Sequence, residues 1–252
     1  MRYFAALIFS VFSSVGFAAE MKTDTFAFAE PTASEKTKEL SLYSTFYHVW
    51  PGKETAEGFP LPLSNGNPSA VRVSARDWCF GAMEGTIVVQ RSDGSRGTYN
   101  YADKKGAPLV NCRPYFTKVK QSVINGMARS RFSAVGAKAP FGLGIGGYRL
   151  VPFRTIAVDY TVIPSGTLLY VPRLRGLAFR DPDGVDRQHD GYLYAADIGG
   201  LIKGNHIDFF SGIQTTNPFP GLIKSSPAGS FQAFVVSSPA AREFLATQHD
   251  AK

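Results

Sequence analysis

Hydrophobic and polar residues alternate along several short stretches of this chain with the two-residue period of a β-strand. The clearest alternation is residues 40–49, Leu-Ser-Leu-Tyr-Ser-Thr-Phe-Tyr-His-Val, which Trp50-Pro51-Gly52 ends. Short apolar runs bounded by Gly or Pro follow in the second half, as expected for strands joined by tight bends. These runs are residues 155–159, 167–171, 191–196, 206–210 and 231–236. The pattern predicts an all-β fold built on a small barrel.

One helix is expected, over residues 239–248 within a C-terminal tail of residues 239–252. Pro239 suits the first helical turn, where a backbone N–H has no intrahelical acceptor. Ser238 is a suitable N-cap, because its hydroxyl accepts a hydrogen bond from the first turn. The helix is short, so the expected fold class stays all-β.

A β-rich segment, residues 65–140, separates the first predicted strand from the others. Within it, Ser92-Asp93-Gly94-Ser95 lies between two runs of strand composition and predicts a hairpin. A chain of 252 residues does not require two domains. We therefore expect one barrel domain, residues 40–238, into which residues 65–140 are inserted as a small subdomain.

The first residues have the layout of a secretory signal peptide. Met1-Arg2 precedes an apolar run that ends at the small-residue exit Gly-Phe-Ala-Ala. We expect residues 1–18 to be the signal peptide and residues 19–39 to be a flexible polar leader. The apolar run is shorter than the roughly 20 residues that span a bilayer. An exported protein, periplasmic or secreted, with no stable membrane insertion is therefore expected.

The two cysteines, Cys79 and Cys112, predict one disulfide in an oxidising compartment. None of the four histidines stands at zinc-ligand spacing from them, so we expect no metal site, and no cofactor either. The formal charge of +7 favours an anionic partner. Lysines and arginines are scattered without a basic helix, which argues against nucleic acid and favours cell-wall polymers. A monomer is expected.

Three aspartates lie at or beside apolar runs in the second half. Asp159 follows Thr-Ile-Ala-Val, Asp197 opens a Gly-rich run, and Asp208 lies between Ile207 and Phe209. An ionised carboxylate in such surroundings is costly unless it is paired, hydrogen-bonded or kept protonated. The three positions therefore predict a shared polar site. An aspartate at a strand end is also a common turn former, and for Asp159 that interpretation stays open.

The runs at residues 156–167, 189–192 and 197–208 resemble the three-aspartate (3D) domain in residue order, spacing and glycines. That domain is shared with the MltA-type lytic transglycosylases and related cell-wall enzymes. Thr45 and Tyr47 resemble the Thr- and Tyr-containing first strand of the same barrel. The resemblance implies a six-stranded double-psi β-barrel, to which this chain adds a small β-rich insertion and a short C-terminal helix.

The resemblance also implies the site residues. Asp208 matches the catalytic acid, Asp197 the carboxylate that assists it, and Asp159 the third aspartate of the motif. Position 198 is Ile where the family pattern usually has Thr. The residues expected to contact the substrate are Lys203, Gly199, Gly200, Thr45 and Tyr47.

The function implied is a peptidoglycan lytic transglycosylase that cleaves the MurNAc-GlcNAc bond and leaves 1,6-anhydroMurNAc. Asp208 alone would act as general acid and then as base, whereas ordinary glycoside hydrolases use two carboxylates. Apolar neighbours and a second carboxylate both raise the pKa of an acid, which suits this task. Two alternatives stay open: a non-catalytic module that binds cell-wall glycan on the same barrel, and hydrolysis by a water nucleophile.

Overall fold

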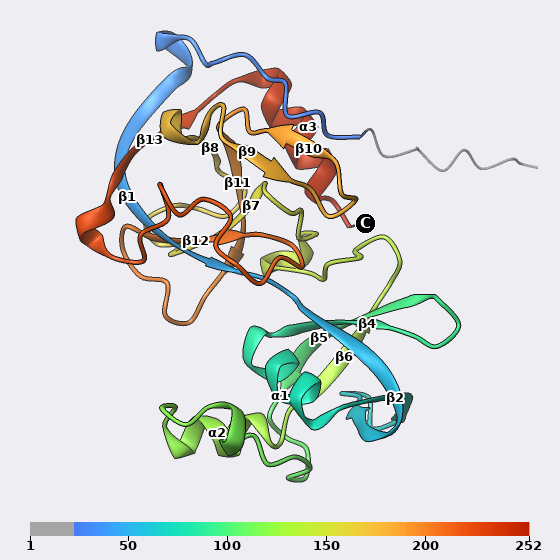
Figure 1. Cartoon of the computed structure of the whole chain (residues 1–252). Helices are drawn as coiled ribbons and strands as arrows, with labels where there is room; N and C mark the ends of the chain where they lie inside the picture. The colour runs from blue at the N-terminus through green and yellow to red at the C-terminus, as the bar shows by residue number, and fades with distance from the viewer. Residues whose placement is uncertain (1–22, 252) are drawn as a thin grey trace, which may run out of the picture.

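The computed structural model describes residues 23–251, which form two lobes, one above the other in Figure 1. The upper lobe is a closed barrel and the lower lobe is an open sheet. The predicted signal peptide, residues 1–18, lies outside the described residues. No helix within residues 23–251 is long and apolar enough to cross a membrane.

Six strands close the barrel in the order β1-β12-β7-β11-β8-β13. Two pairs, β1 with β12 and β7 with β11, are parallel, and the other four are antiparallel. The strands are β1 (Lys36–Tyr47), β7 (Thr155–Val158), β8 (Leu168–Tyr170), β11 (Tyr192–Ile198), β12 (His206–Phe210) and β13 (Phe231–Val236). The expected six-stranded double-psi β-barrel and the all-β class are confirmed.

Alternation along the strands fills the barrel with aliphatic and aromatic side chains. Leu42 of β1, Ile156 of β7, Leu193 of β11, and Ile207 and Phe209 of β12 are buried in one core cluster. Because neighbouring residues of a strand point to opposite faces, the residues between these positions point away from that core. One set of alternate positions in β1 and β12 thus fills the core, and the other set is available for a site outside it.

The lower lobe, which we call the second lobe, is a five-stranded sheet in the order β3-β2-β4-β5-β6. Its strands are β2 (Trp50–Pro62), β3 (Pro68–Val73), β4 (Thr86–Gln90), β5 (Arg96–Asp103) and β6 (Arg131–Val135). The hairpin predicted at residues 92–95 joins β4 to β5, which are antiparallel neighbours. The sheet begins at Trp50, before the expected start of the insertion at residue 65, and the domain limits stay a prediction.

The second lobe also holds two helices that the sequence patterns did not predict, α1 (Ala75–Glu84) and α2 (Gln121–Met127). The ends of α1 follow ordinary capping rules. The Ser74 hydroxyl accepts a hydrogen bond from the Asp77 backbone N–H at 3.0 Å, and Gly85 takes the left-handed conformation at the C-terminal end. The two ends of the helix therefore carry a local sequence signal, although its ten residues show no clear apolar stripe.

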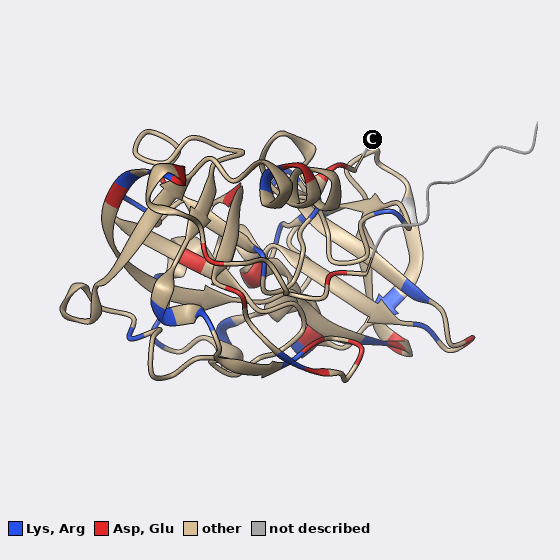
Figure 2. Ribbon diagram, turned by 90° about the horizontal axis from the view of Figure 1, so that it is seen from above, with Lys and Arg blue, Asp and Glu red and all other residues tan. Residues whose placement is uncertain are grey.

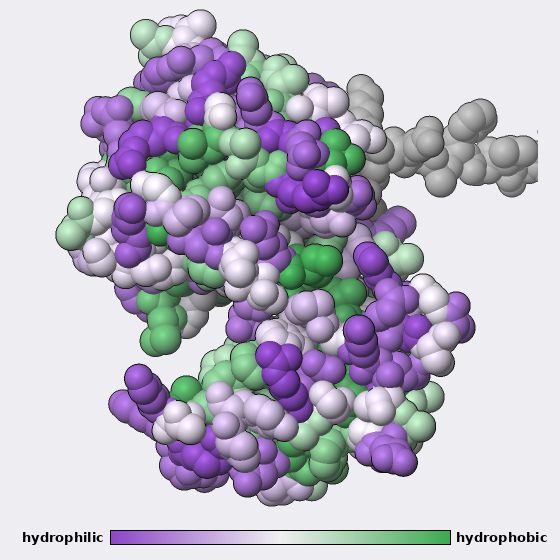
Figure 3. All heavy atoms as spheres, in the orientation of Figure 1, coloured by the Kyte–Doolittle hydropathy of each residue, from purple (hydrophilic) through white to green (hydrophobic). Residues whose placement is uncertain are grey.

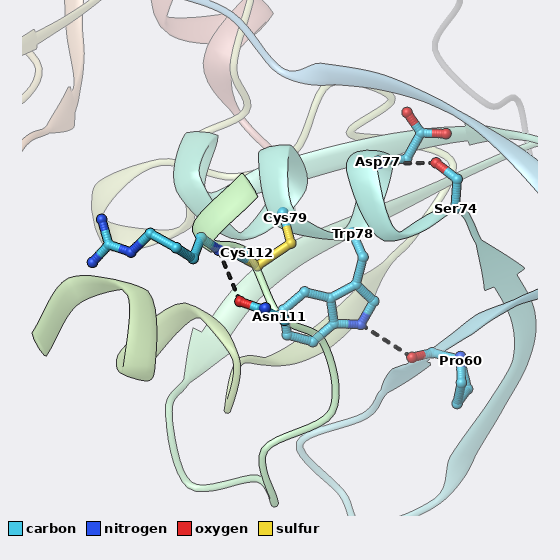
Figure 4. Close-up of a disulfide and its surroundings, with 8 residues drawn as sticks. Pro60, Ser74, Asp77, Trp78, Cys79, Asn111 and Cys112 are labelled. Atoms are coloured by element: carbon cyan, nitrogen blue, oxygen red, sulfur yellow. Dashed lines mark hydrogen bonds between the residues drawn. A yellow bond between two sulfur atoms is a disulfide. The ribbon is translucent and has the colours of Figure 1, made fainter. Parts of the chain in front are cut away.

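The predicted disulfide is confirmed: Cys79 of α1 is bonded to Cys112, 33 positions further along the chain (Figure 4). Beside it, the fully buried Trp78 donates its indole N–H to the Pro60 carbonyl at 3.2 Å. Helix α1 is thus held to β2 on one side and to the segment before α2 on the other. A disulfide of this separation stabilises the fold by roughly 3–4 kcal/mol in the chain-entropy model.

Residues 23–39 differ from the unpacked leader that was expected. Asp24 pairs with the guanidinium of Arg154, whose side chain is 0% exposed. The guanidinium carbon lies 3.8 Å from the centroid of the Phe26 ring. The buried cation is also bonded to Asp190. A buried guanidinium needs anionic partners, and Asp24 is one of them, so this segment packs on the barrel. Strand β1 likewise begins at Lys36, before the expected residue 40.

The C-terminal helix is present as α3 (Pro239–His249) and packs on the barrel through Ala241 and Leu245. A separate hairpin consists of β9 (Ala178–Arg180) and β10 (Asp186–Gln188). Short 3₁₀ turns are η1 (Ala33–Glu35), η2 (Arg113–Tyr115), η3 (Ile145–Gly147), η4 (Pro172–Leu174) and η5 (Pro227–Gly229). Acidic and basic residues are spread over the whole ribbon, as Figure 2 shows from above.

The two lobes meet through a small apolar cluster. Val49, Val88, Leu150 and Phe210 are buried together, so that the segment after β1, strand β4 and strand β12 contact one another. Figure 1 shows β1 continuing past the barrel toward β2 of the second lobe. Figure 3 shows an open notch between the lobes on the side away from the N-terminal trace.

Candidate active site

The candidate site begins with one face shared by two parallel strands. In the pairing of β1 with β12, Tyr43 lies beside His206 and Thr45 beside Asp208. Since Ile207 and Phe209 point into the barrel core, His206 and Asp208 point outward, on the same face as Tyr43 and Thr45. The two-residue period of these strands therefore places a carboxyl group, a hydroxyl group and two rings side by side.

A chain of hydrogen bonds holds one oxygen of Asp208. The Thr45 hydroxyl donates to Asp208 Oδ1 at 2.7 Å, and the same hydroxyl oxygen lies 2.9 Å from His206 Nε2. When the one proton of the Thr45 hydroxyl goes to Asp208, the hydroxyl oxygen can only accept from His206, whose Nε2 then carries a proton. The His206 ring stacks on Tyr43 with centroids 4.6 Å apart. Among residues 23–251, Asp208 Oδ2 has no hydrogen-bond partner.

Burial raises the pKa of Asp208 to about 6. The hydrogen bond from Thr45 lowers this pKa and the negative charge of Asp197 raises it, so the environment as a whole favours the protonated form. A carboxyl group with a pKa near 6 carries its proton in a large fraction of molecules in mildly acidic solution. This protonated state is the one that general-acid catalysis needs.

Asp197 is held by both carboxylate oxygens. The Tyr47 hydroxyl donates to Oδ2 at 2.8 Å, and the Ile198 backbone N–H donates to Oδ1 at 2.9 Å. The pairing of β11 with β7 shifts register between Ala195 and Asp197, an irregularity that redirects a side chain. Burial raises the pKa of Asp197, while the Tyr47 hydrogen bond opposes that rise. With both oxygens occupied, Asp197 is suited to an electrostatic task and not to proton transfer.

The side chain and the main chain of Ile198 have different surroundings. The Ile198 side chain is exposed, while its backbone N–H makes the hydrogen bond to Asp197. The contact with the carboxylate therefore comes from the main chain, which every non-proline residue supplies at this position.

A glycine approaches Asp197 from a loop that the sequence patterns treated only as a connection. A Cβ atom on Gly144 would lie 2.3 Å from the Ala196 carbonyl oxygen and 3.1 Å from Asp197 Oδ1. Any larger residue would push the loop away from the carboxylate. Gly144 is therefore part of the wall around Asp197. Its position in a Gly-rich run did not indicate a contact with this aspartate.

Asp159 has a different environment from the other two aspartates. Its Oδ1 accepts hydrogen bonds from the Thr161 backbone at 3.1 Å and from the Thr161 hydroxyl at 2.7 Å. Its Oδ2 accepts a hydrogen bond from the Gly204 backbone at 3.0 Å. The bond from Gly204 lowers its pKa first, and those from Thr161 add to the effect. Asp159 thus joins the end of β7 to the loop between β11 and β12.

That loop, residues 199–205, contains three of the expected substrate contacts. Lys203 is exposed and lies close enough to Asp159 to lower the pKa of that carboxyl group. A Cβ on Gly199 would lie 2.4 Å from a side-chain carbon of the buried Ile202, whereas one on Gly200 would meet nothing within 4 Å. Leu201, at 90% exposure, projects from the loop. The other two expected contacts, Thr45 and Tyr47, are bonded to the aspartates.

Two titratable residues reach the site without having been predicted. Glu84, the last residue of α1, belongs to the second lobe, and His48 follows directly after β1. Glu84 Oε2 lies 3.9 Å from His48 Nδ1. Burial raises the pKa of Glu84 to about 7, and the charge of Asp208 contributes to that rise. Both residues are far from Asp208 in the sequence, so no local pattern could predict that they lie near it.

The chain is similar to a known domain family and to several solved structures. Residues 154–224 match the family model described as the 3D domain. Among solved structures, E. coli MltA with bound chitohexaose matches with 17% identity, 78% of this chain and 72% of that chain covered, and a TM-score of 0.48. A membrane-bound lytic murein transglycosylase from Agrobacterium tumefaciens matches with 14% identity, coverages of 84% and 79%, and a TM-score of 0.47. No curated protein matches.

Proposed function

We propose that the protein is an exported peptidoglycan lytic transglycosylase with Asp208 as its acid, since residues 154–224 match the 3D domain. The observation that carries the proposal is the state of the Asp208 carboxyl group. One oxygen is held by Thr45, the other has no partner among the described residues, and burial raises the pKa to about 6. Such a group can hold a proton and present it to a bound glycan.

The reaction uses the two protonation states of Asp208 in turn. Protonated Asp208 gives its proton to the bridging oxygen, and the bond between that oxygen and C1 of MurNAc breaks. The resulting Asp208 carboxylate then takes the proton of the C6 hydroxyl of the same sugar. The C6 oxygen bonds to C1, which closes the 1,6-anhydro ring, and Asp208 is protonated again. No water molecule is consumed, so a second carboxylate that activates water is not required.

Asp197 has an electrostatic part in this scheme. As C1 loses its leaving group, positive charge develops on the sugar ring, and a nearby carboxylate stabilises that charge. Its two oxygens are fixed by Tyr47 and by the Ile198 backbone, so the charge stays in place during the reaction. Asp159 and Thr161 hold the end of the 199–205 loop, from which Lys203, Gly199 and Gly200 would approach the glycan.

Export agrees with the covalent and charge properties of the chain. The Cys79–Cys112 disulfide is typical of an oxidising compartment, such as a periplasm or the extracellular medium. The net charge of +7 favours association with an anionic cell-wall polymer. Peptidoglycan strands are therefore the proposed substrate, and the N-terminal signal peptide is the proposed route to them.

The alternative is a glycan-binding module on the same barrel, and one observation argues against it. Asp208, Asp197 and Glu84 are all buried enough for burial to raise their pKa values. Burial of ionisable groups costs stability, and binding of a neutral sugar does not need them. Groups with such shifted pKa values gather at catalytic sites.

The test is Asp208→Asn, because Asn keeps the shape and accepts the Thr45 hydrogen bond but has no acidic proton. Purified mature protein would be incubated with peptidoglycan sacculi and the soluble products analysed by mass spectrometry. The unsubstituted protein should release fragments with anhydro ends, which are one water lighter than reducing ends. Asp208→Asn should lose turnover by at least about 100-fold and still co-sediment with sacculi.

The matched control is Asp186→Asn, since the Asp186 side chain is 82% exposed on β10 and has no contact with the site. This variant should cleave sacculi at the normal rate. Turnover by Asp208→Asn would contradict the assignment of the acid. Reducing ends would identify a hydrolase, and binding of sacculi without any soluble product would support the glycan-binding module.

A further inference from the structure

The second lobe contains a cavity of about 380 Å³ that is open to solvent. Its walls are the end of α1, strand β5 and helix α2, which lies below α1 in Figure 1. All of these elements precede the 3D domain at residues 154–224, and the reaction proposed above uses none of the residues in the walls. A volume of several hundred Å³ is in the range of sites that bind small molecules or short peptides.

Hydrogen bonding and core packing hold the walls of this cavity in place. The Tyr101 backbone N–H donates to the Gly85 carbonyl at 2.7 Å, which joins β5 to the end of α1. Ile124 and Met127 of α2 are buried in the core of the second lobe, together with Cys79 of the disulfide. Because the walls are fixed by the fold, a ligand would bind with little ordering of the chain.

Ser130 lines the cavity with a polar group that the fold does not satisfy. The residue is 1% exposed, and among residues 23–251 its hydroxyl group has no hydrogen-bond partner. Its backbone N–H, in contrast, donates to the Met127 carbonyl at 2.9 Å. A buried hydroxyl without a partner lowers the stability of a protein. A polar group of a bound ligand would supply the missing partner.

Apolar side chains at the cavity are exposed to an unusual degree. Tyr101 and Val123, both in its walls, are 42% and 44% exposed. Met83 and Met127 also line it, and methionine adapts its shape to varied apolar groups. Exposed apolar surface that is gathered at a cavity is typical of a ligand contact. The ligand should therefore have small apolar groups beside its polar ones.

The charge around the cavity favours an anionic ligand. Lys104 lines it, and among the described residues its ammonium group has no ion pair or hydrogen bond. The neighbouring carboxylate, Asp103, is occupied by Arg131 at 2.8 and 2.6 Å. Residues 104–131 include no acidic residue, so the potential there is positive. The basic residues of this segment are Lys104, Lys105, Arg113, Lys118, Lys120, Arg129 and Arg131.

We propose that this cavity binds a stem peptide of peptidoglycan, with a carboxylate of the peptide at Lys104. The inference rests on the proposed function, because it takes peptidoglycan as the substrate. Stem peptides are attached to MurNAc and carry free carboxylates, amide groups and small aliphatic side chains. Their methyl groups suit Tyr101 and Val123, and their amides suit the Ser130 hydroxyl. A phosphate polymer fits less well, since several cations would have to converge on each phosphate and only Lys104 lines the cavity.

The length of a stem peptide allows it to extend from a glycan at the candidate active site toward the cavity. Met83 of the cavity wall directly precedes Glu84, which is close enough to Asp208 for the charge of that aspartate to raise its pKa. An extended peptide of four residues spans about 13 Å. The glycan and its peptide would thus contact different lobes, the glycan at the barrel and the peptide at the second lobe.

The experiment is an NMR titration of the mature protein with a soluble stem peptide, L-Ala-γ-D-Glu-meso-diaminopimelate-D-Ala. Backbone resonances of the cavity walls should shift, and the shifts give the Kd. Lys104→Gln should weaken binding by at least about fivefold, because a hydrogen bond to a charged group is lost. Ser130→Ala removes a hydroxyl that has no partner in the described fold and should weaken binding by about threefold. A peptide with amidated carboxylates should bind the unsubstituted protein as weakly as the free peptide binds Lys104→Gln.

The matched control is Lys105→Gln, which removes the same charge from the next residue, an exposed lysine outside the cavity walls. Its affinity for the peptide should stay within about twofold of the unsubstituted value. Equal weakening by Lys104→Gln and Lys105→Gln would overturn the proposal, because it indicates a general attraction to a basic surface. So would the absence of binding at millimolar peptide, or displacement of the peptide by inorganic polyphosphate at lower concentration, which would indicate a phosphate polymer.

Binding of the free peptide needs no cleavage, so this test separates the cavity from the proposed function. Asp208→Asn should bind the peptide with unchanged affinity, and a protein that binds the peptide but cleaves no sacculi would refute only the proposed function. On peptide-bearing glycan, Lys104→Gln should raise KM about fivefold at unchanged kcat, as expected for a lost binding contact. On glycan freed of its peptides by an amidase, KM should not change. An equal rise in KM on both substrates would refute the peptide assignment.

Discussion

The Thr45 hydroxyl weakens the hold of Asp208 on its proton, and it acts in the opposite direction to burial. Its hydrogen bond to Oδ1 stabilises the ionised carboxylate and lowers the pKa of Asp208. Thr45→Val removes that bond at nearly constant volume. We expect the fall of activity at high pH to move upward by on the order of one pH unit, with a lower maximal rate because the carboxyl group is less well oriented.

The pH profile of sacculus cleavage measures this effect. Thr37→Val is the matched control, since Thr37 is an exposed residue of the same strand whose hydroxyl bonds to the Val235 carbonyl. The control should keep the profile of the unsubstituted protein. A downward shift in Thr45→Val would contradict the direction of the Thr45 effect, and an unchanged profile would mean that the hydrogen bond does not act on the proton.

At the scale of residues, the sequence predicted one polar site shared by three aspartates, whereas Asp159 is bonded to Thr161 and Gly204 instead. Asp197 and Asp208 do lie close together, since the charge of Asp197 raises the pKa of Asp208 and the charges of both raise the pKa of Tyr47. Thr45 and Tyr47 were expected to contact substrate, which stays a prediction, and each donates its hydroxyl to one of these aspartates. Glu84 could not be predicted, because its approach to Asp208 depends on how the second lobe packs and not on any local pattern.

Among the elements, the 199–205 loop depends on Asp159 for its attachment to the barrel. Asp159→Ala removes the acceptor for the Gly204 N–H and for both Thr161 donors. We expect the Gly204 amide to exchange its hydrogen about tenfold faster, since a lost hydrogen bond lowers the cost of local opening. Hydrogen exchange read by NMR checks this, and Asp159→Asn should show a smaller effect because its amide oxygen still accepts.

This variant also decides between the two interpretations of Asp159. If Asp159 only holds the loop, Asp159→Ala should reduce sacculus cleavage far less than Asp208→Asn does. Loss of cleavage with unchanged exchange at Gly204 would instead mean that Asp159 takes part in the chemistry. Asp93→Ala is the control, because Asp93 accepts a similar turn hydrogen bond from Ser95 in the β4–β5 hairpin of the other lobe.

The elements themselves were predictable where their pattern was local. Alternation and bounding glycines or prolines located the barrel strands, and Ser238 with Pro239 located the start of α3. Helix α1 was missed although Ser74 and Gly85 mark its two ends, because its ten residues mix polar and apolar types without a clear stripe. The packing of residues 23–39 was missed because their partner, Arg154, is far away in the sequence.

In the whole molecule, the two lobes have separate cores and share a third apolar cluster. The barrel core and the core of the second lobe contain different residues, and Val49, Val88, Leu150 and Phe210 lie between them. The candidate site draws Asp208 from the first lobe and Glu84 from the second. Its electrostatics therefore depend on the arrangement of the lobes, while the position of each carboxyl group depends on its own lobe.

Burial of the site carboxyl groups should lower the stability of the whole molecule at neutral pH. The pKa of Asp208 is about 6 in the folded protein and near its ordinary value, 3.8, when unfolded. The folded state therefore binds more protons between these two values, so stability is highest below the unfolded pKa and falls as pH rises toward the folded one. Asp208→Asn cannot ionise and should escape this loss.

We therefore expect Asp208→Asn to be more stable than the unsubstituted protein at pH 7.5 by about 2–3 kcal/mol, the free energy of a shift of roughly two pKa units. At pH 4 and below the difference should shrink toward zero, because Asp208 is then protonated in the folded state and increasingly so in the unfolded state. Urea unfolding at both pH values measures it, with Asp186→Asn as the exposed control. If Asp208→Asn is inactive and is more stable only at neutral pH, the cost of burying Asp208 belongs to its proposed task. Equal stability of the two proteins at pH 7.5 would show that the ionised carboxyl group is well solvated and poorly suited to act as an acid.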